Sequence, residues 1–164
     1  MADARQTEKA REVFNTLRGF LDHVDFTFTI VDDDPEDDGR MVLRFTMNGD
    51  DLPMELIFIV DADKELISVY SPMPFKVPDD KRMDMALAVC VGSRGLPDGS
   101  FDYNIMKGTI AYRQTVSFHG DSMIGEALFL YLVKMSGNIV DRYNDRFFSI
   151  AKGLMSVEDF IAAE

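Results

Sequence analysis

Residues 117–125, SFHGDSMIG, contain the side-chain types that a serine hydrolase uses. Such an enzyme needs a base that takes the proton of the nucleophile and donors that stabilise the oxyanion. His119 lies three positions before Ser122 at the end of an extended run, where it cannot easily fold back onto that hydroxyl. The other histidine, His23, lies far upstream, so we expect no catalytic residue here. We predict a corner between a strand and a helix, with Asp121 or Ser122 as the helix cap.

A cluster of acidic residues raises the question of a cation site. Asp34, Glu36, Asp38 and Gly39 match positions one, three, five and six of a calcium loop. The twelfth position, which carries a bidentate acid in such loops, falls at Phe45, and strand patterns rather than helices flank the segment. We predict a solvated loop, and the sequence leaves open whether it binds a cation. Two histidines and one cysteine also disfavour a zinc site, so we expect no metal and no cofactor.

The only cysteine, Cys90, is predicted to lie on the inward face of a helix that starts near residue 79. Met83, Ala86 and Leu87 would share this face. We therefore predict buried packing rather than a reactive thiol. A single cysteine excludes an internal disulfide and fits a reducing compartment.

The segment SPMPFKVP, residues 71–78, alternates apolar residues with prolines that a strand interior does not accept. Met73, Phe75 and Val77 are its apolar residues, in a chain that contains eleven methionines. Methionine-rich surfaces adapt to varied partners, so these three residues are candidates for a partner-binding surface. The alternative interpretation is that the segment covers the core.

The elements that position these residues follow from hydrophobic periodicity. A 3.6-residue period predicts a helix at 4–22, and a period of two predicts strands at 25–31, 40–47, 54–60 and 65–71. A helix, a strand hairpin through Lys107 and Gly108, a long helix from about Ile124 to Ile150 and a short helix from Ser156 should follow. The prediction is one α+β domain, residues 1–164, with an antiparallel sheet packed by helices in the order α-β-β-β-β-α-β-β-α-α.

Composition restricts the partners. The net charge of −12 and the pI near 4.5 disfavour nucleic acids and anionic membranes. The longest apolar run, residues 127–133, is too short to span a bilayer, and the charged N-terminal segment lacks the apolar stretch of a signal peptide. We predict a cytoplasmic protein that does not bind membranes.

The second half of the chain resembles the YbjN-like family, bacterial proteins described as sensory transduction regulators. The motifs are ALAVCVGSRGL, GSFDYNIMKGTIAYRQTVSF and IVDRYNDRFFSIAKG, with the residues Phe101, Tyr103, Gly108, Tyr112, Arg113 and Asp141-Arg142-Tyr143. The resemblance implies a fold similar to type III secretion chaperones, which bind extended client segments and often form dimers. It implies no catalytic residues, and it makes a homodimer possible.

Two hypotheses follow from these observations, and they are favoured over a third, an enzyme that uses His119 with nearby acidic residues. The first is a non-enzymatic protein-interaction module, a regulator or a chaperone-like protein that binds a protein or peptide segment. The second is a small-molecule sensor with a pocket between the sheet and the long C-terminal helix. Tyr103, Tyr112 and Arg113 would line that pocket.

Overall fold

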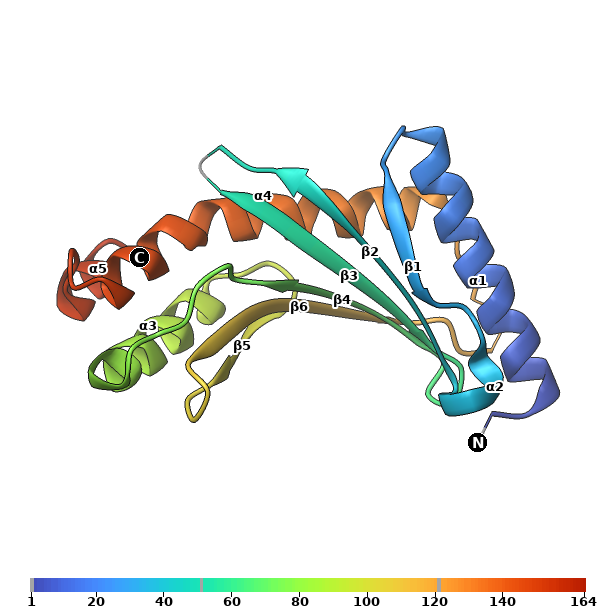
Figure 1. The fold of residues 1–164 in the computed structure, drawn as a ribbon, viewed down its shortest axis with the longest axis horizontal. Coiled ribbons are helices and arrows are strands. Elements are labelled where there is room, and N and C mark those ends of the chain that lie inside the picture. The colour runs from blue at the N-terminus through green and yellow to red at the C-terminus, as the bar shows by residue number, and fades with distance from the viewer. Residues whose placement is uncertain (1, 51, 121) are drawn as a thin grey trace.

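The structure is a computed structural model that describes residues 2–50, 52–120 and 122–164, without the side chains of residues 36 and 37. The first half contains two helices and four strands: α1 (Ala4–His23), β1 (Phe28–Asp32), α2 (Pro35–Asp38), β2 (Arg40–Asn48), β3 (Pro53–Asp61) and β4 (Leu66–Pro72). The second half consists of η1 (Asp79–Lys81), α3 (Arg82–Arg94), β5 (Ser100–Asn104), β6 (Thr109–Ser117), α4 (Glu126–Ala151) and α5 (Val157–Ala162). Figure 1 shows how these elements are arranged.

The six strands form one antiparallel sheet in the order β1-β2-β3-β4-β6-β5. The strands β1 to β4 are a meander, as their short connections predict, and β5 and β6 are a hairpin. After β4 the chain leaves the sheet through α3 and returns so that β6 pairs with β4. This arrangement confirms the predicted α+β class and the predicted order, to which the structure adds the single turns α2 and η1.

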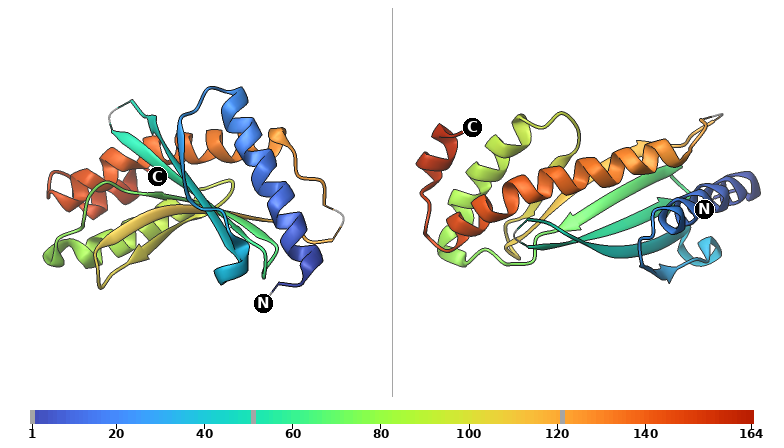
Figure 2. Two further views of the ribbon diagram at one scale, coloured as in Figure 1. Left: turned by 45° about the vertical axis from the view of Figure 1, so that its right-hand side comes forward. Right: turned by 90° about the horizontal axis from the view of Figure 1, so that it is seen from above.

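The two faces of the sheet differ. Along β3 the buried side chains of Met54, Leu56, Phe58 and Val60 alternate with partly exposed ones, because successive residues of a strand point to opposite faces. Both α1 and α4 contact β3, and Figure 2 shows the helices α1 and α4 on the same side of the sheet. The apolar core therefore lies on the helix-covered side.

The helix α1 forms where its sequence predicts it. The side chain of Asp3 accepts a hydrogen bond from the backbone N–H of Gln6, whose side chain accepts one in return from the N–H of Asp3, each at 2.8 Å. This capping box satisfies two free N–H groups of the first turn. The buried residues of α1 follow the predicted apolar face and include Phe14, Leu17 and Phe20.

The inward face predicted for α3 is wrong. Met83 and Leu87 are 68% and 53% exposed, and Cys90 is exposed as well. The buried residues of α3 are instead Met85, Ala88, Val89 and Gly92. The segment from Met83 to Val91 is apolar at nearly every position, so periodicity alone does not decide which side faces the core.

The helix α4 crosses the molecule and has 26 residues, which correspond to about 39 Å. Its buried residues include Leu132, Ile139, Tyr143 and Phe147, whose spacing of seven, four and four positions places them on one side of the helix. No described helix is both long enough and apolar enough to cross a membrane.

Candidate binding cleft

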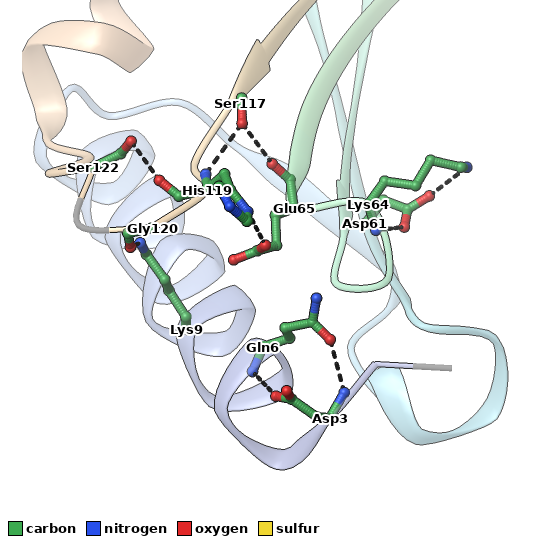
Figure 3. Close-up of polar contacts among 10 residues, drawn as sticks. All are labelled: Asp3, Gln6, Lys9, Asp61, Lys64, Glu65, Ser117, His119, Gly120 and Ser122. Atoms are coloured by element: carbon green, nitrogen blue, oxygen red, sulfur yellow. Dashed lines mark hydrogen bonds and ion pairs between the residues drawn. The ribbon is translucent and has the colours of Figure 1, made fainter.

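The segment that resembles a catalytic motif forms a corner (Figure 3). The hydroxyl of Ser122 donates a hydrogen bond to the backbone carbonyl of His119 at 2.8 Å, not to its imidazole. The imidazole contacts the carboxylate of Glu65 through Nδ1 and is 80% exposed. A serine that donates to a backbone carbonyl is not activated by a base, so this geometry is not that of a nucleophile–base pair.

The caps predicted for the following helix are also wrong or lie outside the described residues. The helix α4 begins at Glu126 with Gly125 as its N-cap and without a side-chain cap, so Ser122 does not fill this role. Asp121 lies outside the described residues. Two contacts with α1 hold the corner in place instead. Lys9 donates a hydrogen bond to the carbonyl of Gly120, and Nδ1 of His23 lies 3.2 Å from Oε2 of Glu126.

The acidic side chains near α2 contact backbone N–H groups and a neighbouring guanidinium group. Asp38 accepts a hydrogen bond from the N–H of Arg40 at 3.0 Å, and Asp34 lies 3.7 Å from the guanidinium of Arg11. Among the described residues, no group of three or more histidine, cysteine or acidic side chains could hold a metal ion. The side chain of Glu36 is not described, so the question of a cation in the loop from Asp34 to Gly39 stays open.

The three residues predicted as a partner surface have different environments. Met73 and Val77 are 6% and 2% exposed and belong to the core, where they cannot meet a partner. Phe75 is partly buried and packs edge-on against Phe148, with ring centroids 5.5 Å apart. The segment covers the core, which is the alternative interpretation, and only Phe75 retains some exposure.

The three residues predicted to line a ligand pocket do not meet in one. Tyr112 is fully buried, and its hydroxyl donates to the carbonyl of Asp98 at 2.8 Å. Arg113 follows it in β6 and therefore points to the opposite face, where it pairs with Asp102 at 2.7 Å. Tyr103 lines a shallow hollow at the β5–β6 hairpin that neither of the other two residues reaches.

A cleft nevertheless lies between the sheet and α4, at a different place. We call it the hairpin cleft, because the end of the β2–β3 hairpin forms one of its walls. It has a volume of about 350 Å³. Its lining residues are Phe20, Val24, Phe26, Met47, Asn48, Gly49, Asp50, Met54, Leu130, Val133, Lys134, Gly137, Asn138 and Asp141.

Register explains why the hairpin wall exists. The pairing of β2 with β3 continues to Asn48 and Pro53, whereas the pairing of β3 with β4 begins only at Ile57. The hairpin end therefore extends beyond β4 and crosses α4, as Figure 1 shows.

Apolar side chains from three elements form the floor of the cleft. Phe20 of α1, Met54 of β3 and Val133 of α4 are buried, and Phe26 packs against Phe45 with centroids 5.0 Å apart. Methionine side chains are flexible and polarizable, so a floor that contains Met47 and Met54 can adjust to apolar groups of different shapes.

Two glycines allow the hairpin and α4 to approach each other. A Cβ atom on Gly137 of α4 would lie 3.1 Å from the terminal methyl of Met47. A Cβ atom on Gly49 would lie 2.4 Å from Oδ1 of Asp141. That same oxygen accepts a hydrogen bond from the N–H of Asp50 at 2.8 Å. This hydrogen bond therefore links the hairpin to α4 at one end of the cleft.

Comparison with known proteins supports the fold. The crystal structure of YbjN, described as a putative transcription regulator from E. coli, matches this chain with a TM-score of 0.54 and 13% sequence identity. The match covers 85% of this chain and 93% of that chain. No family model and no curated protein matches. The predicted YbjN-like fold is confirmed, whereas the likeness to secretion chaperones and the homodimer stay predictions.

Sequence reasoning missed most of the cleft. The segment NGDDLP, which contains Gly49 and Asp50, indicated only a turn. Asp141 lies in the stretch that resembles the YbjN-like family, and this resemblance indicates no role for it. A glycine in one turn and an aspartate 92 positions later, at residues 49 and 141, carry no local signal of their contact.

Proposed function

We propose that this protein is a non-enzymatic interaction module that binds a segment of a partner protein and places an apolar side chain of it in the hairpin cleft. The observation that carries this proposal is the cleft itself, which combines a floor of aromatic, aliphatic and methionine side chains with a polar rim. Recognition sites for peptides and ligands commonly have this composition.

Charge and fold agree with such a role. The net charge of −12 favours partners with basic segments over nucleic acids. The fold is shared with a protein described as a regulator, which is an analogy of architecture and supports a regulatory role only at that level.

Two matched tryptophan variants test the proposal. Asn138 lies exposed on the rim of the cleft, so Asn138→Trp should obstruct the cleft without disturbing the core. Ala127 is exposed on the same helix outside the lining, so Ala127→Trp is the control. We expect affinity purification from a native lysate to recover the same partner with the wild type and with Ala127→Trp, and to lose it with Asn138→Trp. Equal recovery by all three proteins would contradict the proposal.

A small-molecule sensor is the second candidate, and one observation favours it. The cleft lies between the sheet and the long C-terminal helix, where the sensor hypothesis predicts a pocket, and its volume of about 350 Å³ suits a small ligand. A ligand that binds only the folded state must raise the melting temperature. Thermal-shift screening of metabolites with the wild type and Asn138→Trp should then find a stabilising compound that acts on the wild type alone.

A further inference from the structure

The rim of the hairpin cleft carries opposite charges at two separate places along α4. Lys134, Asn138 and Asp141 occupy positions i, i+4 and i+7 and therefore share one side of the helix. Lys134 and Asp141 are about 10 Å apart along the helix axis, from a rise of about 1.5 Å per residue. The hydrogen bond between Asp141 and the backbone of Asp50 adds a second carboxylate to the Asp141 end.

These charges are not neutralised within the described part of the chain. Elsewhere many charges are paired, as with Arg113 and Asp102 at 2.7 Å. The side chains of Lys134, Asp50 and Asp141, in contrast, form no ion pair with any described residue. The side chains of Lys134 and Asp50 are exposed. The cleft thus has a positive end and a doubly negative end, with the apolar floor between them.

The dimensions indicate an extended occupant. An extended chain advances about 3.3 Å per residue, so roughly three residues span the distance between the two charged ends. A helix is about 10 Å wide with its side chains, which is large for a cleft of about 350 Å³. This volume suits one or two apolar side chains from a segment that lies along α4.

We propose that the hairpin cleft selects an extended peptide segment with an apolar anchor between two opposite charges. The basic residue of the segment lies toward Asp50 and Asp141, and its acidic residue lies toward Lys134. The two charges are two to four positions apart in the segment. This inference rests on the proposed function and adds the chemistry of the partner segment.

A library of random twelve-residue peptides displayed on phage tests this inference. After depletion on Asn138→Trp, the wild type should enrich peptides with one apolar anchor, a basic residue on one side and an acidic residue on the other. Lys134→Glu should instead enrich basic residues on both sides, because both ends of the cleft are then negative. Asp50→Asn keeps the backbone N–H that donates a hydrogen bond to Asp141. It should weaken the binding of a peptide selected with the wild type about two- to five-fold.

The outcomes separate the two proposals. Peptides enriched over Asn138→Trp without a basic and an acidic residue on opposite sides of the anchor would overturn the inference and leave the proposed function intact. An unchanged charge preference in Lys134→Glu would do the same. If no peptide is enriched over Asn138→Trp, the peptide-binding function fails and this inference fails with it. A synthetic peptide of the selected sequence with both charged residues replaced by alanine should bind the wild type more weakly than the original.

Discussion

The two halves of α4 are packed in different ways. Around its C-terminal half the rings of Phe101, Tyr143, Phe147 and Phe160 lie within 6.4 Å of one another in successive pairs. The helix α5 closes this cluster, and Arg146 lies over the ring of Phe160 at 4.4 Å and pairs with Glu164. Around the N-terminal half, between Leu130 and Asp141, the neighbouring elements leave the hairpin cleft.

This difference separates stability from binding. The closed end has matched charges and contiguous aromatic packing, which stabilise the fold. The open end leaves apolar surface and unmatched charges accessible, which costs stability and provides a site for a partner. One helix therefore serves as the support for both ends, and substitutions at the two ends should have different consequences.

The largest effect is expected from Phe160→Ala. Phe160 is fully buried, and removal of a buried phenylalanine side chain leaves a cavity that costs about 3 to 5 kcal/mol of unfolding free energy. Urea denaturation measures this loss. The neighbouring Ile161 is 42% exposed, so Ile161→Ala is the control and should change the free energy much less. An equal loss in both variants would mean that α5 does not close the aromatic cluster.

At the open end we expect a smaller loss from Gly49→Ala. The added Cβ would lie 2.4 Å from Oδ1 of Asp141 and 2.8 Å from the carbonyl oxygen of Leu52, so the hairpin must shift. The expected cost is about 1 to 3 kcal/mol, together with weaker binding in the cleft. Gly19, toward the C-terminal end of α1, has no atom within 4 Å of its Cβ position apart from its chain neighbours and the backbone of its own helix, so Gly19→Ala should stabilise the protein instead. Stabilisation by Gly49→Ala would show that the hairpin does not press against α4.

Tyr143→Phe tests the hydrogen bond between Tyr143 and Glu164 at the closed end. Burial raises the pKa of Tyr143, so its hydroxyl stays protonated and donates to Glu164 at 2.8 Å. Loss of this donor should cost about 1 kcal/mol, measured by urea denaturation at neutral pH. Binding in the hairpin cleft should stay unchanged. A change in peptide affinity without a change in stability would contradict the separation of the two ends.

The smallest effect concerns Asp61 and depends on pH. Burial by itself would raise the pKa of Asp61, but the hydrogen bonds and charge of Lys64 and the charge of Arg40 outweigh burial and lower it below 3.8. A carboxyl group with a lowered pKa in the folded state stabilises the protein above its unfolded pKa, and this contribution disappears as the pH falls through the folded value. The unfolding free energy of the wild type should therefore exceed that of Asp61→Asn by less than about 1 kcal/mol at pH 7. The difference should shrink as the pH falls below 3.8 and through the lower folded-state pKa, and a difference that grows on acidification would contradict this assignment.

Much of the fold could be predicted from local signals. Alternation of apolar residues located the strands, and the 3.6-residue period located α1 and α4. The capping box at Asp3 and the turn at Gly108 are local features with known geometry. The buried side of α3 could not be predicted, because apolar residues occur on both of its sides and contacts with other elements choose between them.

The candidate site shows the same limit more strongly. Local patterns in the chain were enough to predict that a sheet and a long helix would pack together, because periodicity and turn chemistry act over a few residues. Which groups face the space between the sheet and the helix depends on how distant parts of the chain pack. Tyr112 and Arg113 are adjacent in the chain but point to opposite faces, while Gly49 and Asp141 meet although they are distant in sequence. Such contacts depend on strand register and helix placement, which are set by packing over the whole core.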